Sequence, residues 1–101
     1  MLKQFDAYQL AIQFHRLCLT LELPSYMRDQ LLRASSSVAF NLSEGSAKPT
    51  ARDQRKFYFI ALGSLRESQT ALDFLDEVPV ELVTISDRLG ACLFRLCHPR
   101  P

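Results

Sequence analysis

The feature that most constrains the fold of this chain is a series of long stretches in which apolar residues are spaced three and four positions apart. Only a few prolines interrupt these stretches. In the last of these stretches the stripe consists of Leu82, Ile85, Leu89, Leu93 and Leu96. This spacing places side chains on one face of an α-helix. The pattern breaks at Pro24, Pro49 and Pro79, because a proline disfavours helical geometry in the residue before it.

These breaks divide the chain into four predicted helices, over residues 4–22, 25–44, 50–77 and 79–97. Ser25 is a predicted cap of the second helix, and Gly45 a left-handed residue that ends it. Thr50 and Asp53 form a predicted capping pair for the third helix. Short connections between long helices make neighbours antiparallel. We therefore predict that residues 1–101 form one all-α domain, an antiparallel up-down four-helix bundle.

The composition is that of a single globular domain of 101 residues, 48% hydrophobic and 23% charged. Three glycines and five prolines are too few for the frequent turns of a β-sandwich. Three cysteines are also too few for a secreted disulfide framework. The sequence has neither a signal peptide nor a long uninterrupted apolar run, so we expect a cytoplasmic protein with no membrane association.

Charge is unevenly distributed along the chain, although the formal net charge is only +1. Residues 1–66 carry nine basic and five acidic side chains, a balance of +4, whereas residues 67–101 carry three and six, a balance of −3. The densest basic group consists of Lys48, Arg52, Arg55 and Lys56. Such side chains contact phosphates in nucleic-acid complexes. They also fit a solvated helix start, where they oppose the helix dipole. This group is the candidate binding site for RNA or a protein partner.

Small and polar side chains lie between the apolar positions of the second and third predicted helices, with Gly63 nearby, so we expect these helices to approach closely. The predicted interior polar network comprises Arg33, Ser37, Asn41, Glu44, Ser64 and Glu67. Within it, Arg33 and Glu67 are candidates for charge-assisted bonds inside or at the edge of the bundle, and Asn41 and Ser64 for neutral ones. Such groups persist in a core only when paired, because an unpaired buried group costs ~1–3 kcal/mol.

A catalytic interpretation of this stripe finds little support. Ser37 beside Asn41 and Glu44 superficially suggests a nucleophile with helpers, but serine catalysis needs a base within hydrogen-bond reach. The two histidines, His15 and His98, lie on other segments. We predict no catalytic residue and favour a structural or interface role for the stripe.

Metal and cofactor sites find no better support. Cys92, Cys97 and His98 lie close together near the end of the chain, but no second pair of ligands accompanies them. No glycine-rich phosphate-binding loop is present either. We predict no metal site and no cofactor.

Two segments resemble the signatures of the 23S rRNA intervening-sequence protein family. Residues 30–45, QLLRASSSVAFNLSEG, are similar to a pattern of Gln, Arg-Ala, Ser-Ile/Val, Asn-Ile and Glu-Gly in the second helix. Residues 56–67, KFYFIALGSLRE, are similar to an aromatic-rich turn that leads into Ala-x-Gly-Ser-x-x-Glu. Leu32 stands where the family often has a second arginine, and Leu42 replaces the usual isoleucine. The ending from Cys97 to Pro101 looks foreign to the family.

The resemblance implies a four-helix bundle that commonly assembles as a ring-like homopentamer. The chain is also similar to the accessory variability determinant of diversity-generating retroelements, which binds a reverse transcriptase and RNA through a basic surface. By this resemblance we expect a non-enzymatic homo-oligomeric scaffold that binds RNA, a reverse-transcriptase-like protein, or both.

Two alternatives stay open. The first is a purely structural homo-oligomer without nucleic-acid binding, in which Tyr58, Phe59 or Phe94 would form subunit contacts. The second is an enzyme that uses Glu44 or Glu67, although no general base, metal or cofactor site accompanies them.

Overall fold

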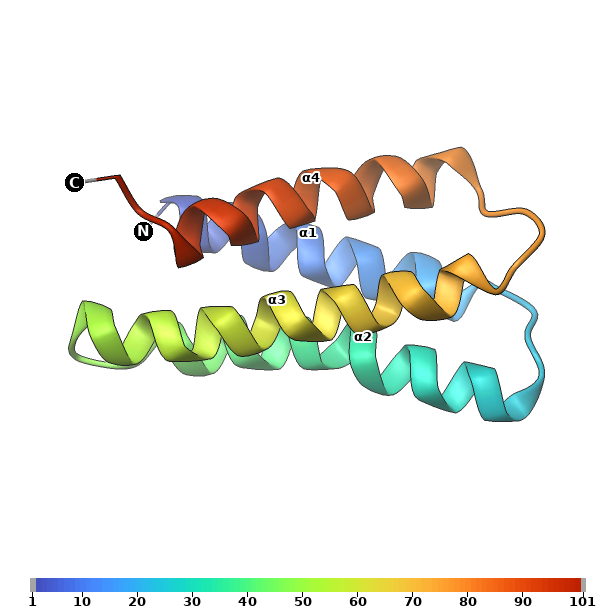
Figure 1. Ribbon diagram of the computed structural model, residues 1–101, viewed down its shortest axis with the longest axis horizontal. Coiled ribbons are helices and arrows are strands. Elements are labelled where there is room, and N and C mark those ends of the chain that lie inside the picture. Colours follow the sequence, from blue (N-terminus) through green and yellow to red (C-terminus); the bar gives the residue numbers. More distant parts are fainter. Residues whose placement is uncertain (1, 101) are drawn as a thin grey trace.

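The computed structural model describes residues 2–100, with side chains placed from Asp6 onward, and contains four α-helices in up-down order (Figure 1). The helices are α1 (Leu2–Leu19), α2 (Ser25–Ser46), α3 (Ala51–Asp73) and α4 (Val80–Cys97). α1 and α4 form one layer and α2 and α3 the other, so that each helix packs against two neighbours. The α2–α3 connection, the start of α1 and the end of α4 lie at one end of the bundle. The predicted all-α four-helix bundle is confirmed.

An apolar core fills the space between the two layers. Its largest fully buried apolar side chains are Phe14, Leu31, Leu42, Leu65, Leu82, Leu89 and Leu93. Burying a side chain of this size stabilises the fold by about 1.5–3 kcal/mol. The core therefore holds together four helices whose apolar stripes are already visible in the sequence.

The start of α3 follows the predicted capping motif in part. Thr50 lies just before the helix in an extended conformation, and its Oγ1 accepts a hydrogen bond from the Asp53 N–H at 3.1 Å. Among the described residues Asp53 forms no return bond to the Thr50 N–H. The Asp53 carboxylate nevertheless suits the positive end of the helix dipole.

The end of α1 lies at Leu19, three residues before the predicted boundary at Glu22. The side chain of Thr20 donates to the Leu17 carbonyl at 2.7 Å. Arg28 reaches back from α2 and donates to the Leu21 carbonyl at 3.0 Å. These donors satisfy carbonyl groups near the helix end, which allows the chain to leave the helix early.

The beginning of α2 also differs from the prediction, because Ser25 is its first helical residue rather than its cap. Pro24 occupies the cap position, and its carbonyl accepts from the N–H groups of Met27 and Arg28 at 3.1 and 2.9 Å. Pro79 takes the same position before α4, so this helix begins at Val80, one residue after its predicted start.

α3 ends at Asp73 instead of continuing to Glu77. The next two N–H groups bond three residues back, at 3.2 and 3.0 Å, which tightens the last turn. Asp73, Asp76 and Glu77 place negative charge at the negative end of the helix dipole. A longer helix would add to that repulsion, so the chain turns before it reaches Pro79.

Gly45 lies inside α2, not beyond its end, and no glycine among the described residues has a positive φ. The predicted left-handed role of Gly45 is therefore wrong. Gly45 is buried against α3, where a Cβ would come within 2.8 Å of Tyr58 Cε1 and 3.0 Å of Phe57 Cβ. Glycine is needed here because α2 and α3 approach too closely for a larger residue.

Candidate nucleic-acid interface

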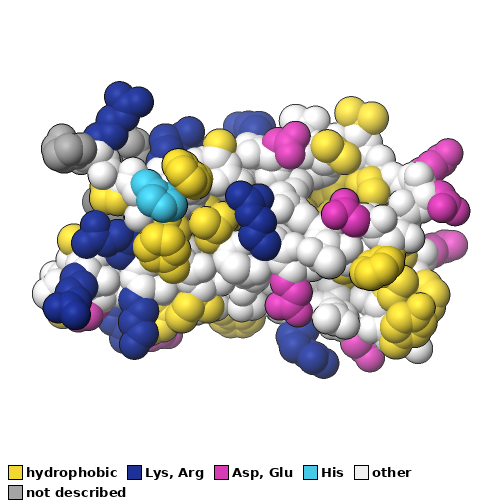
Figure 2. All heavy atoms as spheres, viewed as in Figure 1, with side chains coloured by type: hydrophobic (Ala, Val, Ile, Leu, Met, Phe, Trp, Pro, Cys, Tyr) yellow, Lys and Arg dark blue, Asp and Glu magenta, His cyan; other side chains and the backbone are white. Residues whose placement is uncertain are grey.

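Basic side chains gather at one end of the bundle, and most acidic side chains lie at the other (Figure 2). The basic end carries Lys48, Arg52, Arg55, Lys56, Arg95 and Arg100, together with three acidic residues, Asp6, Glu44 and Asp53. The opposite end carries Glu22, Asp29, Asp73, Asp76, Glu77 and Glu81, together with one arginine, Arg28. The separation follows the long axis of the molecule, which measures 41 Å against 22 and 17 Å. The two ends do not correspond to the basic part (residues 1–66) and the acidic part (residues 67–101) of the sequence, because each end contains residues from both parts.

The four basic residues predicted from the sequence have different surroundings. Arg52 and Lys56 are exposed, while Lys48 and Arg55 are half-buried. Lys48 Nζ pairs with Glu44 Oε2 at 3.3 Å. Among the side chains that the structure describes, this is the one ion pair, so the other three cations stay free to meet phosphate groups.

Two further arginines join this group from the far end of the sequence. Arg95 lies in the last turn of α4, and Arg100 in the tail that follows it. Sequence reasoning missed both, because they belong to the segment with a negative charge balance. A signal was present, since an up-down bundle must bring the end of α4 beside the α2–α3 connection.

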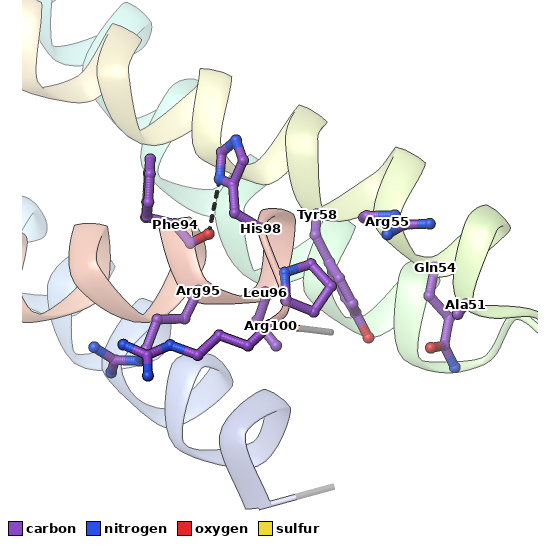
Figure 3. A pocket seen from close by; sticks show the side chains of 10 residues that line it. Ala51, Gln54, Arg55, Tyr58, Phe94, Arg95, Leu96, His98 and Arg100 are labelled. Carbon is purple, nitrogen blue, oxygen red and sulfur yellow. Dashed lines mark hydrogen bonds between the residues drawn. The ribbon is translucent and has the colours of Figure 1, made fainter.

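A pocket of about 520 Å³ lies between the first turns of α3 and the end of α4 (Figure 3). The basic and aromatic side chains that line it are Arg55, Arg95, Arg100, Tyr58, Phe94 and His98. None of the residues that line the pocket is acidic. The pocket is therefore a cationic cavity with aromatic walls.

The aromatic wall is ordered by contacts among three rings. His98 stacks on Phe94, with ring centroids 4.2 Å apart and planes inclined by 30°. Phe59 meets the same imidazole edge-on at 5.5 Å. Phe59 and Phe94 are 48% and 53% exposed, whereas Tyr58 is only 3% exposed. Phe59 and Phe94 remain available as contact residues, but the predicted role of Tyr58 in subunit contacts is wrong because its ring is packed inside the chain.

Three members of the predicted polar network meet between α2 and α3. Ser37 Oγ and Ser64 Oγ lie 2.8 Å apart and share a hydrogen bond across the two helices. Asn41 Nδ2 donates to Ser37 Oγ at 3.0 Å and to the Ser37 carbonyl at 2.9 Å. This small network is half-buried and links the two most extensively packed helices.

The charged members do not join this network. Arg33, Glu44 and Glu67 are all exposed. Glu44 pairs with Lys48, and in the described part of the chain neither Arg33 nor Glu67 forms an ion pair. The two candidates for charge-assisted bonds, Arg33 and Glu67, therefore lie on the surface and not in an interior network. Both positions lie far enough round their helices for the charge to reach water, which avoids the cost of burying it.

A serine and a histidine that the sequence did not pair come together between α1 and α2. His15 Nδ1 lies 2.7 Å from Ser35 Oγ, which also hydrogen-bonds the thiol of Cys18. Ser35 is fully buried and Cys18 is 1% exposed, so a substrate reaches neither. Burial also raises the pKa of Cys18 to about 12, which keeps its thiol protonated and unreactive. This cluster therefore has a packing role. The sequence did not indicate it, because three serines are adjacent and nothing in the sequence shows which of them faces α1.

Potential metal ligands do not converge in the part of the chain that the structure describes, where no group of three or more His, Cys, Asp or Glu side chains forms. Cys97 is buried and His98 is held by Phe94, while Cys92 Sγ accepts from Arg95 Nη2 at 3.4 Å. None of the helices, over their described residues, is long and apolar enough to cross a membrane.

These features define a small up-down four-helix bundle with strongly separated surface charge. The family model described as 23S rRNA-intervening sequence protein matches residues 3–87, so the chain belongs to this family. It is not a known enzyme family. Comparison with curated proteins and with solved structures gave no match. The matched region ends before Arg95, His98 and Arg100, so the α4 side of the pocket lies outside it.

Proposed function

We propose that this protein is a non-enzymatic scaffold that binds RNA through its basic end. One observation carries the proposal: basic residues from two distant segments converge there, and among them only Lys48 has an acidic partner within the described residues. Lysines and arginines of this kind neutralise phosphates and release counterions, so binding depends steeply on salt. A reverse-transcriptase-like protein is an alternative partner for the same surface.

The proposal includes self-association, with the homopentamer as the size that the family resemblance implies. Three aromatic side chains on or beside α2 and α3 support it, since Tyr26, Phe40 and Phe74 are 73%, 73% and 75% exposed. Gly63 supports it as well. It lies in the middle of α3 with open space around its Cα, although alanine there would favour the helix by about 1 kcal/mol. A second copy that packs closely on α3 would explain why this position stays small.

The test is a charge reversal at the basic end with a control of equal charge. The variant Arg52→Glu/Arg55→Glu/Lys56→Glu changes the formal net charge from +1 by six units, to −5. Arg16→Glu/Arg33→Glu/Arg88→Glu produces the same net charge from exposed residues elsewhere. We expect the first variant to fold and lose affinity for a structured RNA, and the second to retain most of it. Equal affinity of the wild type and the first variant would contradict the proposal.

A second candidate, a purely structural homo-oligomer, is favoured by the same exposed aromatic residues. Light scattering with and without RNA, at low and moderate salt, separates the two. A rise in mass with RNA that weakens with salt supports the scaffold, whereas an oligomer indifferent to RNA supports the structural role. A protein that stays monomeric contradicts self-association in both.

A further inference from the structure

The α2–α3 pair carries an apolar groove at the acidic end of the bundle. In Figure 1 the first turns of α2 diverge from the last turns of α3, and the groove lies between them. Tyr26 and Met27 line it from α2, and Phe74 lines it just after α3. The rings of Tyr26 and Phe74 are 73% and 75% exposed, so the folded chain leaves two large apolar side chains beside this groove in water. Such a patch marks an interaction surface.

The volume of the groove, about 200 Å³, indicates what kind of ligand it accepts. Pockets for drug-sized molecules are larger, on the order of 300–1,000 Å³. A groove of this size between two helices suits single apolar side chains of a peptide. A helix laid in such a groove presents them at positions i, i+3 or i+4, and i+7. Met27 is half-buried in the groove, and its flexible thioether side chain adapts to the shape of what packs on it.

The charge around the groove indicates the charge of that helix. Glu67 lines the groove and is exposed. Asp73 follows the lining residue Thr70 by three positions, which makes the two neighbours on the surface of α3. Asp29 stands in the same relation to Tyr26 on α2. Within the described part of the chain none of the three carboxylates forms an ion pair. On the face shown in Figure 2, apolar side chains gather at this end among acidic ones. The partner helix should therefore carry lysine or arginine beside its apolar positions.

The end of α3 gives a second reason to expect cations. Its last turn contains no basic residue, although the last carbonyl groups of a helix form the negative end of its dipole. Asp73, Asp76 and Glu77 add negative charge at the same place. Cations of a partner would relieve this repulsion. Arg33 lies further along α2, toward the middle of the bundle, so the partner's cations belong at the end of α3.

We infer that this groove is the docking site for a basic amphipathic helix of a partner protein. Apolar side chains of that helix pack between Tyr26 and Phe74, and its lysines or arginines meet Glu67 and the carboxylates at the end of α3. The inference goes beyond the proposed RNA binding, because it assigns a protein partner to the opposite end of the bundle and holds whether or not RNA binds.

A second copy of the chain fits the groove less well. In a parallel assembly its own acidic end would come to the same level, and like charges would meet. The proposed contact between copies then rests on Phe40 and Gly63, which lie outside the groove.

The test measures the binding of three synthetic helical peptides of equal length by fluorescence anisotropy. The first has leucines at i, i+3 or i+4, and i+7, with lysines beside them. The second replaces the lysines by glutamates, and the third replaces the leucines by glutamines. We expect the first to bind about tenfold more tightly than either of the others, and less tightly as salt rises. Equal binding of the first and third peptides would show that charge alone acts, and equal binding of the first and second that charge plays no part. Either result, or no binding at all, would overturn the inference and leave the RNA proposal untouched.

Phe74→Ser tests the apolar side of the groove, with Phe40→Ser as the matched control. Both rings are similarly exposed, at 75% and 73%, but only Phe74 lines the groove. We expect Phe74→Ser to weaken binding of the first peptide about tenfold at an unchanged melting temperature, as the loss of a central aromatic anchor does. Phe40→Ser should bind as the wild type does. If Phe74→Ser instead lowers the mass in light scattering and leaves peptide binding intact, the groove is a contact between copies and the inference is wrong.

Glu67→Gln/Asp73→Asn tests the charged side. Asp6→Asn/Asp87→Asn is its control, because both pairs are exposed and both raise the formal net charge from +1 by two units, to +3. Neither Asp6 nor Asp87 lines the groove. The first pair should weaken binding of the lysine peptide about tenfold at low salt, and the second should have a much smaller effect. Equal losses would show that net charge, and not the groove, determines affinity.

Discussion

His15 Nδ1 and Ser35 Oγ lie 2.7 Å apart and join α1 to α2 through a polar contact. Burial lowers the pKa of His15 below its ordinary value of 6.5, because the charged imidazolium is the form that loses most by leaving water. The neutral ring therefore belongs to the folded state.

The free energy of unfolding should consequently fall as the pH drops below 6.5. Between the lowered pKa of folded His15 and 6.5, the unfolded chain binds more protons than the folded one, so stability rises with pH across this window and levels off above it. Urea unfolding at about pH 7.5 and about pH 5 measures the difference. His15→Gln should reduce it, because the substitution removes the group whose pKa is lowered by folding. An identical pH response in the His15 variant would contradict this account.

Gly45→Ala and Gly63→Ala should change stability in opposite directions. The added methyl group at Gly45 would meet Tyr58 Cε1 at 2.8 Å, and we expect a loss of about 1–3 kcal/mol from overpacking. At Gly63 nothing lies within 4 Å, and we expect a gain of about 0.5–1 kcal/mol from the helix preference of alanine. Thermal and urea unfolding of both variants, at a concentration where the protein is monomeric, measure these changes. Similar effects at the two positions would mean that the α2–α3 contact is looser than described.

The three cysteines should react with thiol reagents at very different rates. Cys18 is 1% exposed with its pKa raised to about 12, and burial also raises the pKa of Cys97, which is 3% exposed. Cys92 is half-buried, so it should be labelled first. Mass spectrometry after brief labelling of native protein should therefore detect one modification, which Cys92→Ser removes. Urea-unfolded protein provides the control in which all three react. Early labelling of Cys18 would indicate that α1 detaches from the core.

The hydrogen bond between Ser37 and Ser64 should show a measurable coupling. Ser37→Ala and Ser64→Ala each leave the other hydroxyl with fewer partners, whereas the double variant removes both groups together. A double-mutant cycle should give about 0.5–1.5 kcal/mol of coupling, the usual size for such a bond. Ser43→Ala, exposed on the same helix, combined with Ser64→Ala serves as a control that should be additive. Additivity in the first cycle would mean that water replaces the bond at no cost.

The fold was largely predictable because its determinants are local. The stripe from Leu82 to Leu96 and the prolines that separate the helices act over a few residues, and so does the Thr50 cap. The role of Gly45 was not predictable, because it depends on Tyr58. The Tyr58 ring contacts Gly45 only when α2 and α3 are packed together. The early end of α3 depends on the balance between the dipole and the acidic residues around Asp73, which periodicity alone does not reveal.

The candidate site was predictable only where it is continuous in the sequence. The group from Lys48 to Lys56 stands out because its members are adjacent, but Arg95 and Arg100 join it only through the path of α4. The prediction that Arg33 and Glu67 belong to an interior network failed for a related reason. A helical stripe one position too wide includes residues that face water, and only the packed pair of helices defines where the stripe ends.

Charge separation along the 41 Å axis gives a nearly neutral molecule a large electric dipole moment. In the field of a polyanion such a molecule experiences a torque before contact, and it arrives with the Arg55 and Arg95 end foremost. Its rate of association therefore depends on orientation more than on its formal charge of +1. The same dipole acts between copies of the protein. In the proposed assembly, parallel neighbours would place like ends together, and the apolar surfaces of α2 and α3 would have to supply the energy that holds them side by side.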